Sequence, residues 1–291
     1  MEQKIKLITA NALNVLEEQV HVESRLMGGM SNLMYLITVK GGKYTFRIPG
    51  KNAEVFVNRA TELSAINQIE SLNLNNKTVY FDLDTGYKIA EFVEGTPLSE
   101  MKNPELYLEE VAQVLHRLHD SKLTAINEYA PFERLEKYEK LIKEKEVSHE
   151  LSYFDLKAKL LKNQTFLNQF NKVFCHNDSQ ISNIVLAKDK TYLLDWEFAG
   201  QNDPFYDLAC VGNQDFDLAL KILPIYLGKK PVNQDFKRLY LWRAFQCLQW
   251  HNVALYKDLI GLSQDLNVDF KLVAENYLKK ADNLLMHAER Y

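Results

Sequence analysis

The sequence is poor in cysteine, has no long apolar run and carries no excess of positive charge. Its three cysteines, Cys175, Cys210 and Cys247, lack metal-ligand spacing and leave an odd number for pairing, which is typical of reduced thiols in a cytosol-like compartment. No apolar stretch reaches the length of a membrane-spanning helix. The net charge of −4 provides no basic surface for nucleic acid. We therefore expect a cytoplasmic protein that binds no nucleic acid and does not insert into a membrane.

The sequence does contain enough apolar residues for a substantial core. Hydrophobic residues make up 46% of the 291 residues, which excludes a disordered chain and allows one large domain or two lobes. Alternating apolar residues predict strands in the first ninety residues, at 21–27, 33–40, 43–48, 78–82 and 87–92. Helical spacing predicts helices at 4–20, 54–69, 105–119, 133–145, 234–257 and 270–290.

The pattern changes near residue 92, which predicts two lobes. Residues 92–97 interrupt the alternation with glycine and proline and are the candidate hinge. We expect an α+β protein with a small antiparallel sheet in an N-terminal lobe at 1–93. A mainly helical C-terminal lobe should follow at 94–291.

The most informative motif runs from Cys175 to Asn183 and is followed by Asp195. It contains H-x-D-x-x-x-x-N, the spacing of a kinase catalytic loop, in which the aspartate acts as base and the asparagine binds metal. Short strands are predicted around it, at 172–175, 184–187 and 192–194. A loop followed by such a hairpin would bring Asp178, Asn183 and Asp195 to one point. Phosphoryl transfer requires one carboxylate beside the attacking hydroxyl and further oxygen ligands for Mg²⁺, and these residues supply both.

Two interpretations of the motif involve no catalysis. The Asn and Asp side chains could serve only as turn residues that bond their own backbone. We interpret His176 as a packed imidazole that bonds the loop backbone and shapes the turn, rather than as a catalytic group.

Taken in order, these motifs resemble the choline/ethanolamine kinase and aminoglycoside phosphotransferase superfamily, a branch of the protein-kinase-like fold, and most closely the bacterial choline kinases. The resemblance covers nearly the whole chain and rests on residues 28–32, 44–50, 58–62, 176–183, 195–200 and 202–209. It implies a two-lobed kinase that uses ATP and Mg²⁺ to phosphorylate a small amino alcohol, choline or ethanolamine. In that family Asp178 would be the catalytic base, Asn183 and Asp195 the metal ligands, and Asp207 a brace for the catalytic loop.

The resemblance also implies that a glycine turn holds the nucleotide phosphates. Gly28 and Gly29, with Ser31 and Asn32, would offer backbone N–H groups to phosphate oxygens because glycine lacks a Cβ atom. The turn lacks G-x-G-x-x-G, and the alternative is an ordinary hairpin turn.

Further nucleotide contacts follow from the same resemblance. Arg47 replaces the usual kinase lysine and would pair with the phosphates and with Glu62; the alternative is a surface ion pair of little energetic weight. Adenine is expected to bond the backbone near Glu91 and Val93.

An aromatic pocket is implied for the substrate cation, because a quaternary ammonium has no N–H donor and binds to ring faces. Tyr206 and Trp250 fall where the family has aromatic residues, and Gln180 falls close to the substrate. Each ring equally fits core packing. Cys247 stands where the first aromatic of a W-x-x-W-like pattern is expected, which would favour ethanolamine unless another ring fills the gap. Glu197 could assist the metal or the substrate cation, or be a solvated acid.

Other activities stay open from the sequence. The acceptor could be an aminoglycoside, thiamine or another small alcohol, and a catalytically silent nucleotide-binding protein is a further possibility. The oligomeric state and the choice between ATP and GTP leave no trace in the sequence.

Overall fold

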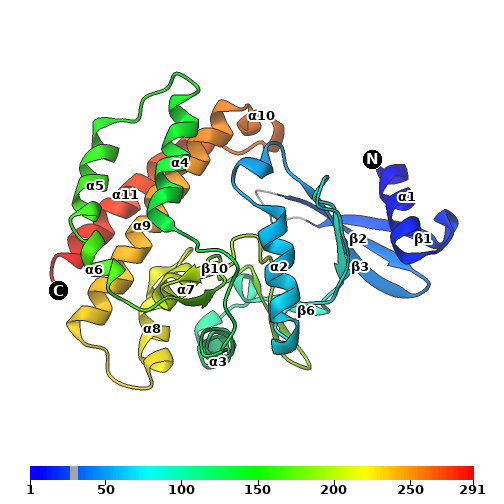
Figure 1. Ribbon diagram of the computed structural model, residues 1–291, viewed down its shortest axis with the longest axis horizontal. Helices are drawn as coiled ribbons and strands as arrows, with labels where there is room; N and C mark the ends of the chain where they lie inside the picture. The colour runs from blue at the N-terminus through cyan, green and yellow to red at the C-terminus, as the bar shows by residue number, and fades with distance from the viewer. Residues whose placement is uncertain (27–31) are drawn as a thin grey trace.

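The computed structural model describes residues 1–26 and 32–291, with a sheet at one end and a helical part at the other (Figure 1). The sheet has five antiparallel strands in the order β1-β2-β3-β5-β4. Their bounds are β1 Val20–Leu26, β2 Asn32–Val39, β3 Gly42–Pro49, β4 Thr78–Phe81 and β5 Lys88–Glu91. The predicted α+β class, with its antiparallel N-terminal sheet, is confirmed.

One face of this sheet is buried by the first helix, α1 (Glu2–Leu13). Ile5 of α1 packs in one apolar cluster with Ile37 and Phe46 of the sheet. The helix is shorter than the predicted 4–20, because Asn14 adopts a left-handed backbone with φ of 51°. Asparagine tolerates this conformation, in which the backbone leaves the helix.

The second helix, α2 (Arg59–Ile69), begins later than the predicted residue 54. A short 3₁₀ turn at Ala53–Val55 comes first. The side chain of Asn58 then accepts hydrogen bonds from two backbone N–H groups of the first turn, which is the role of a helix N-cap. The cap fixes where α2 begins and therefore which side of it carries Glu62.

Part of the candidate hinge at 92–97 is a strand. Gly95–Pro97 forms strand β6, which pairs with β8 (Ile184–Ala187) in the three-stranded sheet β6-β8-β9. A Cβ atom at Gly95 would lie 2.6 Å from the Leu186 carbonyl oxygen, so glycine allows this close pairing. The glycine in this segment is therefore explained by the close pairing of β6 with β8.

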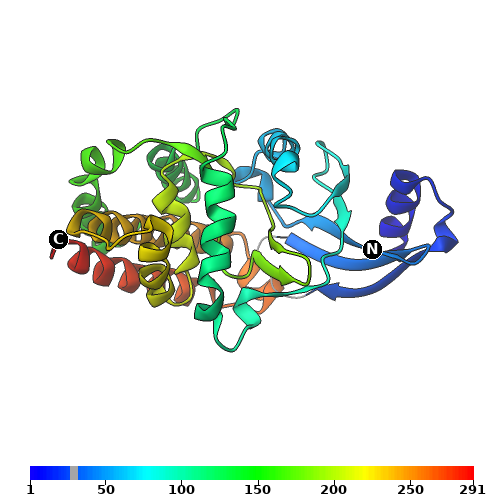
Figure 2. The ribbon, with the colours of Figure 1, turned by 90° about the horizontal axis from the view of Figure 1, so that it is seen from below.

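The helical part surrounds one long buried helix. Its helices are α3 Leu108–His119, α4 Pro131–Lys143, α5 Leu151–Leu161, α6 Gln164–Asn168, α7 Pro204–Val211, α8 Phe216–Leu227, α9 Asn233–Leu259, α10 Leu262–Leu266 and α11 Phe270–Ala288. Most of α9 is buried, and α11 packs along it (Figures 1 and 2). Across the two described segments, no helix is both long enough and apolar enough to cross a membrane. Short strands interrupt the helices at β7 Val173–Cys175, β9 Thr191–Leu193 and β10 Gly200–Asn202.

Candidate active site

The catalytic loop, residues 176–183 between β7 and β8, is held by Asp207 of α7. The Asp207 carboxylate accepts the backbone N–H of His176 at 2.8 Å and that of Asn177 at 2.7 Å. The Asp207 carbonyl accepts the Ser179 hydroxyl at 2.8 Å. Asp207 is fully buried, so these bonds are shielded from water. The helix thus fixes the loop backbone, as the bracing role required.

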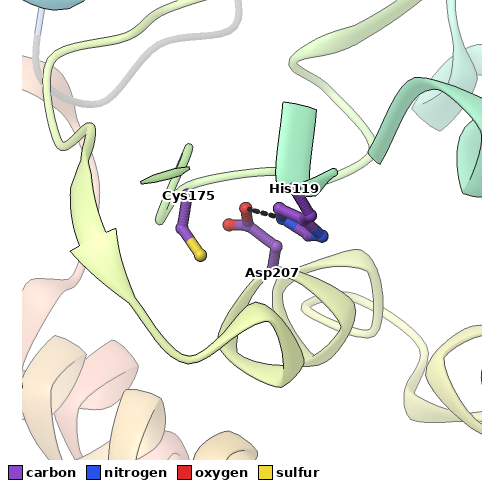
Figure 3. A group of neighbouring side chains, drawn as sticks. All are labelled: His119, Cys175 and Asp207. Atoms are coloured by element: carbon purple, nitrogen blue, oxygen red, sulfur yellow. Dashed lines mark hydrogen bonds and ion pairs between the residues drawn. The ribbon is translucent and has the colours of Figure 1, made fainter. Parts of the chain in front are cut away.

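A buried His119–Cys175–Asp207 cluster lies behind this loop (Figure 3). The three potential metal-ligand atoms lie within 4.8 Å of one another, but each has a hydrogen-bond partner. His119 Nε2 donates to Asp207 at 2.9 Å, Tyr226 lies 2.8 Å from His119 Nδ1, and the Cys175 thiol donates to the Asn202 carbonyl. Burial raises the pKa of the Cys175 thiol, which opposes the thiolate form that metals bind. We interpret the cluster as support for the loop.

His176 shapes the loop, as predicted. Its Nε2 donates to the Leu194 carbonyl at 3.0 Å, and its Nδ1 accepts the backbone N–H of Asp178 at 3.2 Å. The ring meets Trp196 edge-on. With both nitrogens bonded to backbone, the imidazole links the loop to the segment that carries Asp195.

Asp178 is buried and oriented by two amide side chains. Its Oδ2 atom accepts from Asn183 Nδ2 at 3.1 Å and from Gln180 Nε2 at 3.3 Å, and its carbonyl accepts from Asn183 at 2.9 Å. The Asn183 NH₂ group is therefore engaged with Asp178, and its side-chain oxygen is the atom that could bind a cation.

Asp195 and Glu197 both approach the Arg47 guanidinium. Asp195 has a left-handed backbone with φ of 69°, and its Oδ1 lies 3.7 Å from Arg47 Nη1. The Oε2 atom of Glu197 lies 3.8 Å from the same nitrogen and accepts from Asn32 at 3.1 Å. Glu197 is buried, so it is not a solvated acid.

Asp178, Asp195 and Glu197 form an acid cluster, whose mutual repulsion a divalent cation would reduce. Burial, and then the charges of Asp195 and Glu197, raise the pKa of Asp178 well above its usual range. Burial and the charge of Asp195 raise the pKa of Glu197 to about 8. The donor set of carboxylate and amide oxygens is the set that Mg²⁺ prefers. These residues therefore fit a magnesium site.

Arg47 and Glu62 form a buried pair, not the surface pair allowed as an alternative. The guanidinium donates to both Glu62 oxygens, at 2.6 and 2.8 Å, and the residues are 3% and 1% exposed. Lys88 lies opposite Arg47 in the β3–β5 register and donates to the same carboxylate at 3.0 Å. Burial opposes ionisation, but the charges of Lys88 and Arg47 lower the pKa of Glu62 to about 2. The sequence analysis missed Lys88, although the strand pairing could have indicated it.

Of the remaining residues predicted to bind the nucleotide, only some lie within the described ranges. Gly28, Gly29 and Ser31 lie outside the described residues. Glu91 ends β5; its N–H donates to the Lys77 carbonyl, and its own carbonyl accepts from a side chain. Val93 follows in the connection to β6.

A cavity of about 190 Å³ lies beside Glu197. Its aromatic lining consists of Phe56, Tyr138, Phe198 and Trp250. The rings of Phe198 and Trp250 stand nearly perpendicular, with centroids 6.3 Å apart. Trp250 was predicted; the other three rings were missed, although Phe198 directly follows Glu197 in the sequence.

Two aromatic predictions need correction. Tyr206 is 1% exposed, bonds the Tyr129 hydroxyl at 3.0 Å and packs on Trp242, so its ring belongs to the core. Cys247 is fully buried, and neither residue is among the described residues that line the cavity. Because Cys247 faces the core from α9, the cysteine at this position does not remove an aromatic wall from the cavity.

A family model described as choline/ethanolamine kinase matches residues 23–219. Protein LicA of Haemophilus influenzae is 28% identical over 194 residues, which cover 64% of this chain and 56% of that protein. The chain therefore spans little more than half of that relative. A probable ethanolamine kinase of Arabidopsis thaliana is 24% identical over 212 residues, covering 66% of this chain and 56% of that protein.

Solved structures agree on the fold. The crystal structure of choline kinase LicA from Streptococcus pneumoniae superposes with a TM-score of 0.81 at 24% identity and covers 99% of both chains. Spectinomycin phosphotransferase, solved with ADP and spectinomycin, gives a TM-score of 0.55 at 14% identity over 94% of both chains. These likenesses confirm the protein-kinase-like architecture.

Proposed function

The chain belongs to the choline/ethanolamine kinase family, and we propose that it transfers the γ-phosphoryl group of ATP to the hydroxyl of choline or ethanolamine. One observation carries the proposal: Asn183 donates to Asp178, and Asp195, whose charge acts on Asp178, lies 3.7 Å from the buried Arg47. A structure of LicA in complex with AMP supports a nucleotide as the second ligand. The reaction would take place in the cytoplasm, where the three free cysteines stay reduced.

Asp178 acts as the base in this proposal. Both amide donors occupy its Oδ2 atom, so Oδ1 is the oxygen available to the acceptor hydroxyl. The hydroxyl proton passes to Asp178 as the oxygen bonds to the γ-phosphorus, while the bond to the β-phosphate oxygen breaks and ADP leaves. The raised pKa of Asp178 makes the carboxylate a better proton acceptor once nearby positive charge keeps it ionised.

Asn183 and Asp195 would hold Mg²⁺, with Glu197 as a further oxygen donor. Bound there, the ion would neutralise phosphate charge during transfer. Arg47 lies 3.7 Å from Asp195, so its guanidinium would be next to the phosphates of a nucleotide bound on that side. Gly28, Gly29, Ser31 and Asn32 would supply the glycine-turn contacts.

Adenine would bind near the connection after β5. Both backbone groups of Glu91 already have partners within the chain, which favours Val93 over Glu91 for the base contact.

The amino-alcohol cation would bind in the aromatic cavity. Ring faces attract a quaternary ammonium, and each well-placed ring contributes roughly 0.5 to 2 kcal/mol. Phe198 and Trp250 present two nearly perpendicular walls, and Glu197, a member of the acid cluster, lines the same cavity. Gln180, which donates to Asp178, would lie near the reacting hydroxyl.

The test is ADP release with Mg²⁺ and ATP, measured separately with choline, ethanolamine, thiamine and an aminoglycoside. We expect choline or ethanolamine to stimulate release strongly. Asp178→Ala should lower turnover by about 100-fold or more, since a positioned base contributes at least that much. Asp189→Ala, an exposed acid in the β8–β9 turn, is the matched control.

Each outcome has a distinct meaning. Stimulation by ethanolamine alone would narrow the substrate to a primary ammonium. Stimulation only by thiamine or an aminoglycoside would overturn the substrate assignment. No stimulation by any alcohol, with nucleotide still bound, would favour a silent nucleotide-binding protein.

A further inference from the structure

Arg243 of α9 is a buried guanidinium whose partners are amides. It is 2% exposed. Its Nη1 donates to Gln246 Oε1 at 2.9 Å, and its Nη2 donates to Asn213 Oδ1 at 2.8 Å and to the Asn213 carbonyl at 3.1 Å. Within the described ranges, no Asp or Glu oxygen lies within 4.0 Å of its nitrogens. A buried charge is costly unless it is well bonded, so the position of Arg243 needs a reason.

The hydrogen bonds continue from Asn213 to the proposed base. Asn213 Nδ2 donates to Gln180 Oε1 at 2.8 Å, and Gln180 Nε2 donates to Asp178 Oδ2 at 3.3 Å. A single chain of bonds therefore runs from Arg243 of α9, through the segment after α7, to the catalytic loop.

The direction of this chain is set by a donor-only guanidinium at one end and an acceptor carboxylate at the other. A guanidinium has only donors, so the Asn213 oxygen must face Arg243 and the Asn213 NH₂ group must face Gln180. The Gln180 oxygen then faces Asn213, which turns its NH₂ group toward the Asp178 carboxylate. Without the arginine, Asn213 could reverse and place its oxygen against the Gln180 oxygen, and this repulsion would weaken the donation of Gln180 to Asp178.

We propose that Arg243 is a positioning residue for phosphoryl transfer: through Asn213 it fixes the amide orientation of Gln180. This inference rests on the proposed kinase activity. Asn183 also donates to Asp178 Oδ2, at 3.1 Å, so losing the chain weakens the orientation of the base without removing it.

The first test compares Arg243→Met with Arg243→Lys. Methionine should lower kcat by about tenfold, because one of two donors to the base is lost, while the nucleotide Kd stays within about twofold. Lysine also has only donors and should restore most of kcat. Equal kcat losses in both variants would overturn the proposal, because charge and donors would then be irrelevant.

Asn213→Asp is the sharper variant. Aspartate pairs with Arg243 and should preserve or raise Tm, but it offers no donor to Gln180. We expect kcat to fall about as far as in Arg243→Met, roughly tenfold, in a well-folded protein. Wild-type kcat in this variant would overturn the proposal, and this variant decides alone if Arg243→Met does not fold.

Arg238→Met is the matched control. Arg238 is a second buried arginine of α9, but it forms a forked ion pair with Asp203 and lies outside the chain of bonds. Its loss should lower Tm while kcat per folded molecule is unchanged. A kcat loss equal to that of Arg243→Met would indicate general helix packing. An inactive wild type would instead refute the proposed function, which keeps the two failures distinct.

Discussion

At the scale of single residues, the clearest arrangement is one carboxylate shared by two cationic side chains. Glu62 of α2 receives both Arg47 and Lys88, which face each other across β3 and β5. A second cation on the same carboxylate leaves the three groups with net positive charge, which suits a site next to phosphates. Both cations can bind Glu62 because the planar Arg47 guanidinium pairs with both carboxylate oxygens in one plane, which leaves room for Lys88.

Arg47→Lys keeps the positive charge but should still damage the site. A lysine cannot fork, so two ammonium groups would compete for Glu62. We expect KM for ATP to rise by about tenfold and the free energy of unfolding to fall by about 1 to 3 kcal/mol. Steady-state kinetics and urea unfolding measure both quantities.

Lys43→Met provides the control for that change. Lys43 lies on the same strand, but its ion pair with Glu94 is exposed. Neither KM nor stability should change measurably. An unchanged KM for ATP in Arg47→Lys would remove Arg47 from the phosphate site.

Local spacing decided which site residues the sequence could reveal. Asp178 and Asn183 share one loop, and Asp195 ends the next hairpin, so short-range geometry suffices to bring them together. Phe56 and Tyr138 reach the cavity from different parts of the chain. Their roles depend on tertiary packing, which a single sequence does not show.

At the scale of elements, α7 is the structural base of the catalytic loop. Its Asp207 accepts bonds from two loop N–H groups and from His119 of α3. The charge and hydrogen bond of His119 offset the opposing effect of burial and lower the pKa of Asp207. One helix position thus joins two other elements.

Asp207→Asn should separate the loop from α7. An amide cannot accept with both atoms, so one buried N–H group loses its partner, and the free energy of unfolding should fall by about 1 to 3 kcal/mol. We expect kcat to drop while the nucleotide Kd is retained, measured by turnover and nucleotide titration. Asp217→Asn, exposed in the first turn of α8, should change nothing. A wild-type kcat in Asp207→Asn would contradict the bracing role.

His251 makes the contact between α9 and α11 sensitive to acid. It is 4% exposed, its Nδ1 donates to the Ala274 carbonyl, and its Nε2 lacks a hydrogen-bond partner. Burial lowers its pKa from 6.5 to about 4. Between these values the unfolded chain binds more protons than the folded one, so stability is complete above pH 6.5 and declines as the pH falls toward 4.

The wild type should therefore lose about 2 kcal/mol of unfolding free energy through His251 between pH 7.5 and pH 5.0. Urea unfolding at both values measures the loss. His251→Gln should show a smaller loss over the same interval, and His21→Gln, exposed on β1, should match the wild type. Equal losses in all three proteins would show that His251 does not titrate with unfolding.

The short buried helix α7 was not predicted, although the long buried helix α9 was predicted at 234–257. In α7 every residue from Phe205 to Val211 is buried, so no polar face marks a helical period. By contrast, α3 carries a clear apolar stripe, and its existence was predicted correctly. The ends of α1 and α2 were missed because Asn14 and Asn58 stop or start them through backbone and cap geometry.

At the scale of the whole molecule, the connection between β3 and α2 links the sheet to the helical part. Lys51 donates to the Ile260 carbonyl at 2.8 Å, and Asn52 donates to the Tyr256 hydroxyl at 3.2 Å. The ring of Phe56 packs edge-on against Tyr256 of α9. The change of pattern near residue 92 did predict two parts, but a boundary at 93 stays a prediction, and these contacts across it were not visible in the sequence.

Magnesium should couple nucleotide binding to the stability of the whole molecule. The acid cluster repels nucleotide phosphates until a cation lies between them, so ADP with Mg²⁺ should bind more tightly than ADP with EDTA. At a hundred times its Kd, a ligand stabilises the folded state by about 2.7 kcal/mol, which should raise Tm by roughly 5 °C. Differential scanning fluorimetry with and without Mg²⁺ measures this shift.

Asp195→Asn tests whether the shift comes from the proposed metal site. Losing a carboxylate ligand should remove most of the Mg²⁺-dependent part of the shift, while the smaller shift with ADP and EDTA stays or grows as repulsion falls. Asp189→Asn, an exposed acid in the preceding turn, should behave as the wild type. If Asp195→Asn keeps the full Mg²⁺-dependent shift, the metal is held elsewhere, and the convergence of Asp178, Asn183 and Asp195 would need another explanation.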